Sequence, residues 1–256
     1  MSSPAPAERD WDAGTYDRIS DPQFGWAMEQ LERLELAGNE VVLDAGCGSG
    51  RVTEVLAERV PQGHVYAVDA APSMVAHTQA RLGGRITALC QDLVELKLPE
   101  PVEVIFSNAT FHWIDDHERL FTRLCSALAP GGRLLAQCGG RGNIDAFRTL
   151  ADEVAAQAPF APYFSDWQRP WTYASPEETA ARLIRAGFTD VSCALTPRQV
   201  TLTEPRPFIR TVCLVRHLDP LPEELRERFL EEVLARTGQP LVLDYVRLNM
   251  VARRAD

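Results

Sequence analysis

The chain has 256 residues, of which 45% are hydrophobic and 24% charged, the composition of an ordinary globular protein. Its formal net charge of −10 argues against a nucleic acid or an anionic membrane as partner, because binding to phosphates needs clustered Lys and Arg. The sequence has neither an apolar run of about 18 residues nor the basic start and apolar core of a secretion signal. We therefore expect a cytoplasmic protein that acts on a small molecule, and we take a monomer as the working expectation.

The cysteines are scattered along the chain, and no C-x-x-C pair occurs among them. Four of them fall within apolar strand or helix patterns, which indicates buried free thiols rather than a metal site or a disulfide framework. We expect no bound metal. The six positions are Cys47, Cys90, Cys125, Cys138, Cys193 and Cys213.

In chain order, residues 1–10 are rich in Ala, Pro and Ser and predict a disordered lead. Residues 11–36 predict a turn followed by an amphipathic helix. Strand and helix patterns then alternate, which predicts right-handed crossovers and a parallel sheet with helices on both faces. The predicted strands are 41–45, 64–69, 85–90, 102–107 and 132–138, and the predicted helices are 51–60, 72–82, 116–129 and 144–157.

The character of the chain changes after residue 158. Residues 159–173 hold six aromatic residues, which could either bind a substrate or form the small core of a cap. The patterns beyond it predict helices at 175–186, 206–217 and 222–236 and strands at 188–195 and 241–251. We predict one domain over 11–256, with its core in 38–140 and 188–256 and a cap from 11–36 and parts of 140–240.

The stretch VVLDAGCGSG, residues 41–50, predicts a buried strand, a glycine turn and the start of a helix. Glycines at such a junction let a ligand lie against bare main chain, next to the free N–H groups of the helix. A dinucleotide fingerprint would need Gly or Ala where Arg51 stands, so a nicotinamide site fits poorly. The pattern D-x-G-x-G-x-G instead resembles the first motif of class I S-adenosylmethionine (SAM) methyltransferases.

Acidic residues follow the second and third predicted strands. Asp69 lies 19 residues beyond Gly50, where a carboxylate can accept hydrogen bonds from ribose hydroxyls, although an Asp at this place can also cap a helix. Met74, one turn later, could pack on the adenine or simply in the core. Asp92 could bind the adenine amino group and Leu93 could cover the ring; the alternative for Asp92 is a solvated loop acid.

The fourth predicted strand leads into SNATFHW, residues 107–113. The strand next to the first one ends where ligands bind in open α/β sheets. We expect Asn108 and Ala109 to face the methionine part of SAM, and Phe111, His112 and Trp113 to face the methyl acceptor. The following stretch, L-x-P-G-G, predicts that a helix stops at Pro130 and that two glycines form a turn into the next strand.

These motifs, with WDAGTY (11–16), DHERLF (116–121) and YVRLNMVARR (245–254), resemble the trans-aconitate methyltransferase group and its neighbours, including juvenile hormone acid methyltransferase. The resemblance implies a Rossmann-like fold with a seven-stranded, mostly parallel sheet, helices on both faces and a small helical cap. It also implies that Gln23 and Trp113 hold an acceptor carboxylate. SAM would then contact Tyr16, Asp44, Gly46, Cys47, Gly48, Asp69, Ala70, Met74, Asp92, Leu93, Asn108 and Ala109.

The resulting hypothesis is a SAM-dependent methyltransferase acting on a carboxylate oxygen by in-line displacement. A carboxylate is already ionised near neutral pH and needs no base. A phenol or alcohol would need one, and His112 would be the candidate. A C-methyltransferase of a natural product is a further alternative. A SAM-binding protein without catalysis and a nicotinamide oxidoreductase are more remote ones.

Overall fold

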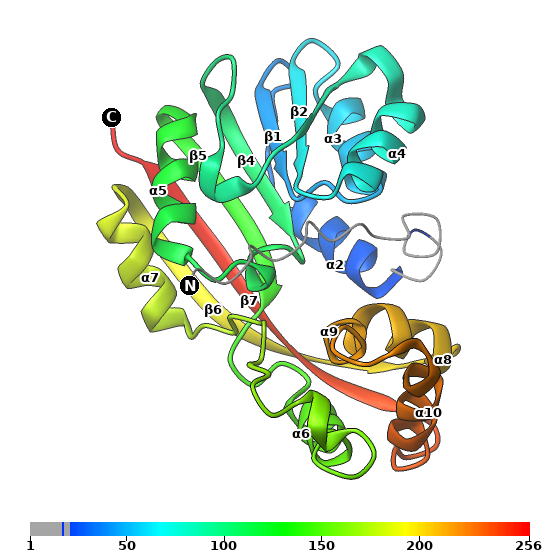
Figure 1. The fold of residues 1–256 in the computed structure, drawn as a ribbon. Helices are drawn as coiled ribbons and strands as arrows, with labels where there is room; N and C mark the ends of the chain where they lie inside the picture. The colour runs from blue at the N-terminus through cyan, green and yellow to red at the C-terminus, as the bar shows by residue number, and fades with distance from the viewer. Residues whose placement is uncertain (1–16, 18–20) are drawn as a thin grey trace, which may run out of the picture.

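The computed structural model describes residue 17 and residues 21–256, and its centre is a seven-stranded sheet (Figure 1). The strand order is β3-β2-β1-β4-β5-β7-β6, in which β7 runs antiparallel to both of its neighbours and the other pairs are parallel. This confirms the predicted class of fold. The strands are β1 (Val41–Ala45), β2 (His64–Asp69), β3 (Thr87–Cys90), β4 (Val102–Asn108), β5 (Leu128–Gly139), β6 (Phe188–Thr201) and β7 (Val242–Arg254).

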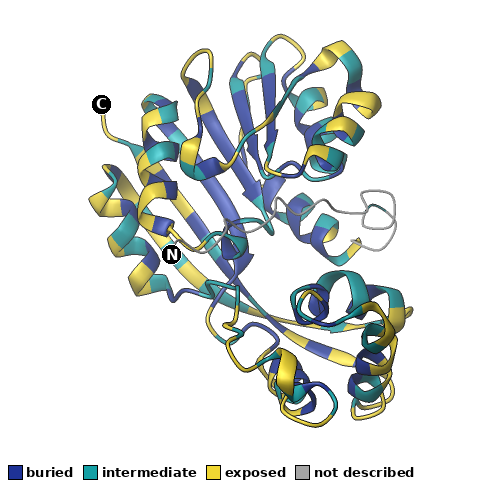
Figure 2. Cartoon of the chain, viewed as in Figure 1, coloured by how far each residue is buried: buried dark blue, intermediate teal, exposed yellow. Residues whose placement is uncertain are grey.

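Helices cover both faces of the sheet, because the central strands are apolar on both sides. Leu43 and Ile105 pack on the face under α5 and α7, whereas Val42 and Val104 pack on the face under α2 and α3. Figure 2 shows the central strands buried between these layers. The bounds are α2 (Asp21–Leu31), α3 (Arg51–Arg59), α4 (Pro72–Leu82), α5 (His117–Ala127) and α7 (Pro176–Arg185).

A second hydrophobic cluster lies beyond the sheet, where the ends of β6 and β7 extend toward α6 (Asp145–Ala155) and α10 (Glu223–Leu234) (Figure 1). Trp26 of α2 belongs to this cluster, and its ring lies edge-on to Tyr245 of β7 at 5.0 Å. We call this part of the molecule the cap. No described helix is long and apolar enough to cross a bilayer.

The helix predicted over 206–217 is broken into three pieces. These are α8 (Pro205–Phe208), a π-helical turn (Ile209–Cys213) and α9 (Val215–Leu218). The N–H of Leu214 donates to the carbonyl of Ile209, five residues back, at 2.8 Å. The wider turn rotates the chain so that the apolar residues on both sides of it face the cap cluster.

The predicted turn at Pro130–Gly132 is wrong in kind. The helix ends at Ala127, and these residues form a bulge inside β5. The ladder to β4 is broken between the pairs Val102–Leu128 and Val104–Arg133, so that four residues leave the ladder together. β6 and β7 are longer than predicted because they pair with each other from Phe188–Arg254 to Thr201–Val242.

Candidate cofactor and acceptor site

The turn after β1 needs its glycines for two different reasons. All three have positive φ, of +85° at Gly46, +53° at Gly48 and +83° at Gly50. A Cβ on Gly46 would lie 2.1 Å from Oγ1 of Thr110, and one on Gly50 would lie 2.8 Å from Oγ1 of Thr78. A Cβ on Gly48 would meet nothing within 4 Å. Gly48 therefore presents bare main chain to open space, as a bound nucleoside requires.

Asp44, in β1, lies beside this turn and contacts the helix that follows it. Its side chain is buried and accepts a 2.7 Å hydrogen bond from the hydroxyl of Thr53 on α3. Burial raises the pKa of Asp44 to about 7, the Thr53 hydrogen bond opposes this, and the nearby charge of Asp69 adds to it.

Asp69, at the end of β2, joins the glycine turn to α4. One carboxylate oxygen accepts from the N–H of Gly48 and the other from the N–H of Ala71, each at 2.9 Å. Burial raises the pKa of Asp69, and these backbone hydrogen bonds oppose the rise. Each oxygen keeps a lone pair that could accept from a ribose hydroxyl. Ala70, the next residue, is exposed.

The residues expected near adenine differ in their surroundings. Asp92 is exposed and accepts a 3.0 Å hydrogen bond from the N–H of Val94, so it caps a short 3-10 turn at Leu93–Glu95. The side chain of Leu93 is buried in the core cluster under α5, and Met74 is buried on α4. Of these three, Asp92 alone is exposed.

Two buried acceptor oxygens belong to residues that line a small cavity beside the glycine turn. Oδ1 of Asn108 and Oε1 of Gln23 have no hydrogen-bond partner among the described residues, although Nδ2 of Asn108 donates to the backbone carbonyl of Gln23 at 3.0 Å. The cavity has a volume of about 60 Å³, and Gly46, Cys47 and Gly48 also line it. These oxygens fit SAM, because its amino-acid ammonium group is a hydrogen-bond donor. Ala109, with φ of +58°, follows at the strand end.

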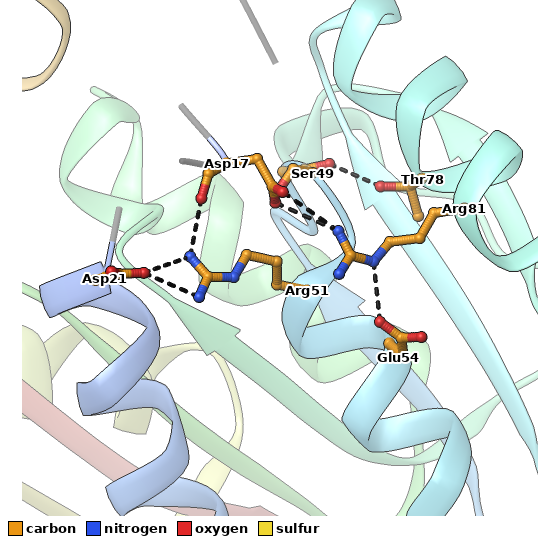
Figure 3. Close-up of polar contacts among 8 residues, drawn as sticks. Asp17, Asp21, Ser49, Arg51, Glu54, Thr78 and Arg81 are labelled. Carbon is orange, nitrogen blue, oxygen red and sulfur yellow. Dashed lines mark hydrogen bonds and ion pairs between the residues drawn. The ribbon is translucent and has the colours of Figure 1, made fainter. Parts of the chain in front are cut away.

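A network of charged and polar side chains lies beside this cavity and includes Ser49 and Arg51 from its lining (Figure 3). Asp17 accepts from the hydroxyl of Ser49 at 2.6 Å and pairs with Arg81, whose Nη1 lies 3.4 Å from its carboxylate. Arg51 donates to the carbonyl of Asp17 at 2.9 Å and to the carboxylate of Asp21 at 3.0 Å. The start of α2 is thereby held over the glycine turn. Tyr16, predicted to contact SAM, lies outside the described residues.

His112 lies in a 3-10 turn, Phe111–Trp113, after β4. Its ring is buried, and Nδ1 accepts a hydrogen bond from the N–H of Gly139 at 3.2 Å. Burial holds the pKa of His112 well below 6.5, and the charges of Arg247 and His117 add to this. The ring is therefore neutral, with its proton on Nε2.

The aromatic residues of the stretch 159–173 belong to two different groups in the structure. Phe160 and Phe164 pack in the cap cluster. Trp171 and Tyr173 instead continue from His112 and Trp113: the ring centroids lie 5.6 Å apart for Tyr173 and His112, and 6.0 Å apart for Trp171 and Trp113. We call these four residues, His112, Trp113, Trp171 and Tyr173, the aromatic wall.

The structure does not bring all the predicted acceptor residues to one point. His112 and Trp113 are neighbours, with ring centroids 5.1 Å apart, whereas Gln23 contacts Asn108 on the cofactor side. Sequence reasoning missed the arginines near the wall, Arg148 and Arg216, and the buried Arg247, whose Nε donates to Gln137 at 3.2 Å. The dense aromatic stretch was the available signal, but it does not indicate which arginines fold against it.

A larger cavity, of about 390 Å³, lies over β5, β7 and β6 and shares no residue with the glycine turn. It includes Arg33, Arg133 and Arg253. It is therefore not a candidate for the SAM site.

The sheet order, the glycine turn and Asp69 at the next strand end define a class I SAM-dependent methyltransferase. A family model described as "Methyltransferase domain" matches residues 42–132. The trans-aconitate 2-methyltransferase of Methylobacterium nodulans is 34% identical over 96% of this chain and 98% of its own length. The chain belongs to this family of methyltransferases, and S-adenosyl-L-methionine is its cofactor.

Two further comparisons agree. A trans-aconitate 2-methyltransferase of an Acidovorax species is 28% identical over 96% of this chain and 99% of its own length. A solved structure of Haemonchus contortus phosphoethanolamine N-methyltransferase 2, in complex with phosphomonomethylethanolamine and S-adenosylhomocysteine, matches with a TM-score of 0.62 at 19% identity. It covers 95% of this chain and 57% of that chain, and it shows the shared fold. The protein is thus an enzyme that methylates a small molecule.

Proposed function

We propose that the methyl acceptor is a carboxylate oxygen of a small carboxylic acid. The observation that carries the proposal is the hydrogen bond from the N–H of Gly139 to Nδ1 of His112. That bond occupies the only basic nitrogen of the neutral ring, so His112 is poorly suited to take a proton from a phenol or an alcohol. A carboxylate needs no base, because it is ionised at neutral pH.

In this proposal the enzyme works by positioning. Bound SAM supplies an electrophilic methyl group on a sulfonium. Nε2–H of His112 and the indole N–H of Trp113 are donors that could orient a carboxylate, whereas Gln23 lies on the cofactor side, where its carbonyl accepts from Asn108. The ring of His112 is buried, which excludes water from its donor, and such orientation can lower a barrier by about 7 to 11 kcal/mol. The SAM contacts proposed for Asp69, Asn108 and the glycine turn rest on the lone pairs and the open main chain described above.

The first acceptor to test is trans-aconitate, because that substrate is named for the relatives that match nearly the full chain. Purified enzyme with methyl-labelled SAM should be offered trans-aconitate, simple monocarboxylic acids, a phenol, an alcohol and an amine. We expect labelled product only from acids, and we expect the label to be released by mild base, as from a methyl ester. Product that survives base on every substrate would overturn the carboxylate proposal.

The remaining expectations belong to the same proposal. We propose one methyltransferase domain over 11–256, with the cap closing the acceptor side, and a monomer in the cytoplasm that binds neither nucleic acid nor membrane. The cap cluster, the six free cysteines and the net charge of −10 support this picture. Light scattering at working concentration tests the monomer directly.

A further inference from the structure

Two arginines from the cap bracket the aromatic wall. The guanidinium carbon of Arg148, on α6, lies 4.8 Å from the ring centroid of Tyr173 and 5.7 Å from that of Trp171. The guanidinium carbon of Arg216, on α9, lies 5.8 Å from the ring centroid of Trp113. Both positive charges therefore lie within one aromatic group that also contains His112.

Neither guanidinium is fully used by the protein. Nε of Arg148 and Nε of Arg216 are buried and find no hydrogen-bond partner in the part of the chain that the structure describes. Arg148 is 7% exposed overall and pairs at 2.9 Å with Asp145, whose side chain is 62% exposed; Arg216 pairs at 3.7 Å with Asp219, whose side chain is 44% exposed. Contact with an aromatic face leaves the N–H groups free, because they point outward in the plane of the guanidinium. A buried donor left without a partner is costly unless a ligand supplies the acceptor.

Three arginines lie near the aromatic wall, and two of them, Arg148 and Arg216, also pair with carboxylates at the protein surface. Arg247, also buried, adds a third positive charge near His112 and contributes to its lowered pKa. The phenol of Tyr173 does not compensate, because burial raises its pKa to about 12 and keeps it neutral. Positive charges gathered around a partly buried wall, in a chain of net charge −10, are suited to an anionic ligand.

We propose that Arg148 and Arg216 bind a carboxylate of the acceptor other than the one that receives the methyl group, and that these two residues distinguish di- and tricarboxylic acids from monocarboxylic ones. This rests on the proposed carboxylate function and deepens it. His112 and Trp113 orient the carboxylate that receives the methyl group, while the arginines hold one that does not react. The planar fork of a guanidinium matches a carboxylate in two parallel hydrogen bonds, which fixes the direction of the substrate.

The test compares Arg148→Gln and Arg216→Gln on two substrates, propane-1,2,3-tricarboxylate and butanoate. We expect KM for the tricarboxylate to rise about 10- to 100-fold in Arg148→Gln, since a charge-assisted hydrogen bond is lost. KM for butanoate and the affinity for SAM should change less than about threefold. Arg148→Lys keeps the charge but loses the planar fork. Its KM for the tricarboxylate should lie between those of the unmodified enzyme and Arg148→Gln.

Arg228→Gln is the matched control. Arg228 also lies over an aromatic ring, that of Phe160 at 5.9 Å, but on the outside of the cap. It should leave both KM values unchanged. Equal losses on tricarboxylate and butanoate in Arg148→Gln would indicate a structural role and overturn the proposal, as would no loss on either.

Calorimetry separates this proposal from the carboxylate function. Binding of propane-1,2,3-tricarboxylate to enzyme loaded with S-adenosylhomocysteine should weaken in Arg148→Gln and Arg216→Gln, whatever product the enzyme makes. If the product is base-stable but tricarboxylate binding depends on Arg148 and Arg216 as expected, the carboxylate function is refuted and the role proposed for the two arginines is retained. If the enzyme forms an ester but both variants bind the tricarboxylate as well as the unmodified enzyme does, only the role proposed for the two arginines is refuted. If Arg148→Gln fails to fold, Arg216→Gln, whose side chain is 28% exposed, decides the outcome.

Discussion

The N–H of Gly139, the last residue of β5, donates to Nδ1 of His112, in the turn after β4, at 3.2 Å. Two neighbouring strand ends thus fix the tautomer of a histidine that stands where the acceptor is expected. The same ring carries its proton on Nε2 and is held neutral by burial. This relationship makes the histidine a donor, and two predictions depend on it.

The first concerns pH. Because the pKa of His112 lies well below 6.5 and an acceptor carboxylate has a pKa near 4, neither group titrates in the neutral range. We expect kcat with a carboxylic acid to be flat between about pH 6 and 8. The measurement is initial rate against pH at saturating SAM and acceptor. A rate that rises about tenfold per pH unit across this range would show that a base or an ionising phenol limits the reaction.

The second concerns substitution. In His112→Asn the amide oxygen can still accept from the N–H of Gly139, but the Nε2 donor is lost. We expect kcat/KM for the acid to fall about 10- to 100-fold, with little change in melting temperature. SAM affinity, measured by calorimetry, should stay within twofold. Full activity in this variant would remove His112 from acceptor binding.

The glycine turn offers a matched pair of variants. Gly46→Ala places a methyl group 2.1 Å from Thr110, and we expect it to prevent folding or to lower stability by several kcal/mol. Gly48→Ala meets open space and costs only its left-handed backbone, roughly 1 to 2 kcal/mol. Its methyl group would occupy the space beside the main chain where SAM is expected, so binding should weaken at least about tenfold. Thermal unfolding with and without SAM separates the effect on stability from the effect on binding. A SAM affinity in Gly48→Ala equal to that of the unmodified enzyme would contradict the predicted place of SAM.

The charged network beside the cofactor cavity should affect the rate of SAM release more than the affinity for SAM. Exposed ion pairs contribute about 0.2 to 1 kcal/mol each, and added salt screens them. We expect Arg51→Gln, which loses contacts to Asp17 and Asp21, to release SAM a few times faster and to reduce the salt dependence of that rate. Stopped-flow dissociation at low and high salt measures this. Arg185→Gln, which loses a surface pair with Glu118, is the control and should match the unmodified enzyme.

Asp44 predicts a direct dependence of stability on pH. The folded-state pKa of Asp44, about 7, exceeds the ordinary aspartate pKa of 3.8, so between these pH values the folded state holds more protons than the unfolded state. Stability should therefore fall as pH rises through this window and level off above about pH 7. Asn at this position keeps an acceptor for Thr53 and cannot titrate.

The comparison of Asp44→Asn with the unmodified protein isolates this group. From pH 5 to 8, the unmodified protein should lose roughly 2 to 3 kcal/mol relative to the variant, at 1.36 kcal/mol per pKa unit. Urea unfolding at several pH values provides the free energies. Parallel curves for the two proteins would mean that Asp44 is not strained by burial.

The sequence by itself determined the class of fold and predicted a cofactor site at the glycine turn. Both depend on local patterns: alternating apolar segments dictate strands and crossover helices, and only glycine tolerates the backbone of the turn at Gly46 to Gly50. Asp69 follows because its distance along the chain from the turn equals one βαβ step. The signals for the cap helices were weaker, and the π turn between α8 and α9 has no local pattern that predicts it.

Only the tertiary structure decided how the residues on the proposed acceptor side are arranged. The proton position of His112 is set by Gly139, which lies 27 residues away in the chain. The role of the aromatic stretch is divided between the cap cluster and the wall by the way α6 and α9 pack against it. Arg148 and Arg216 look like ordinary surface arginines in sequence, because burial and the lack of a partner for Nε arise only when distant elements meet.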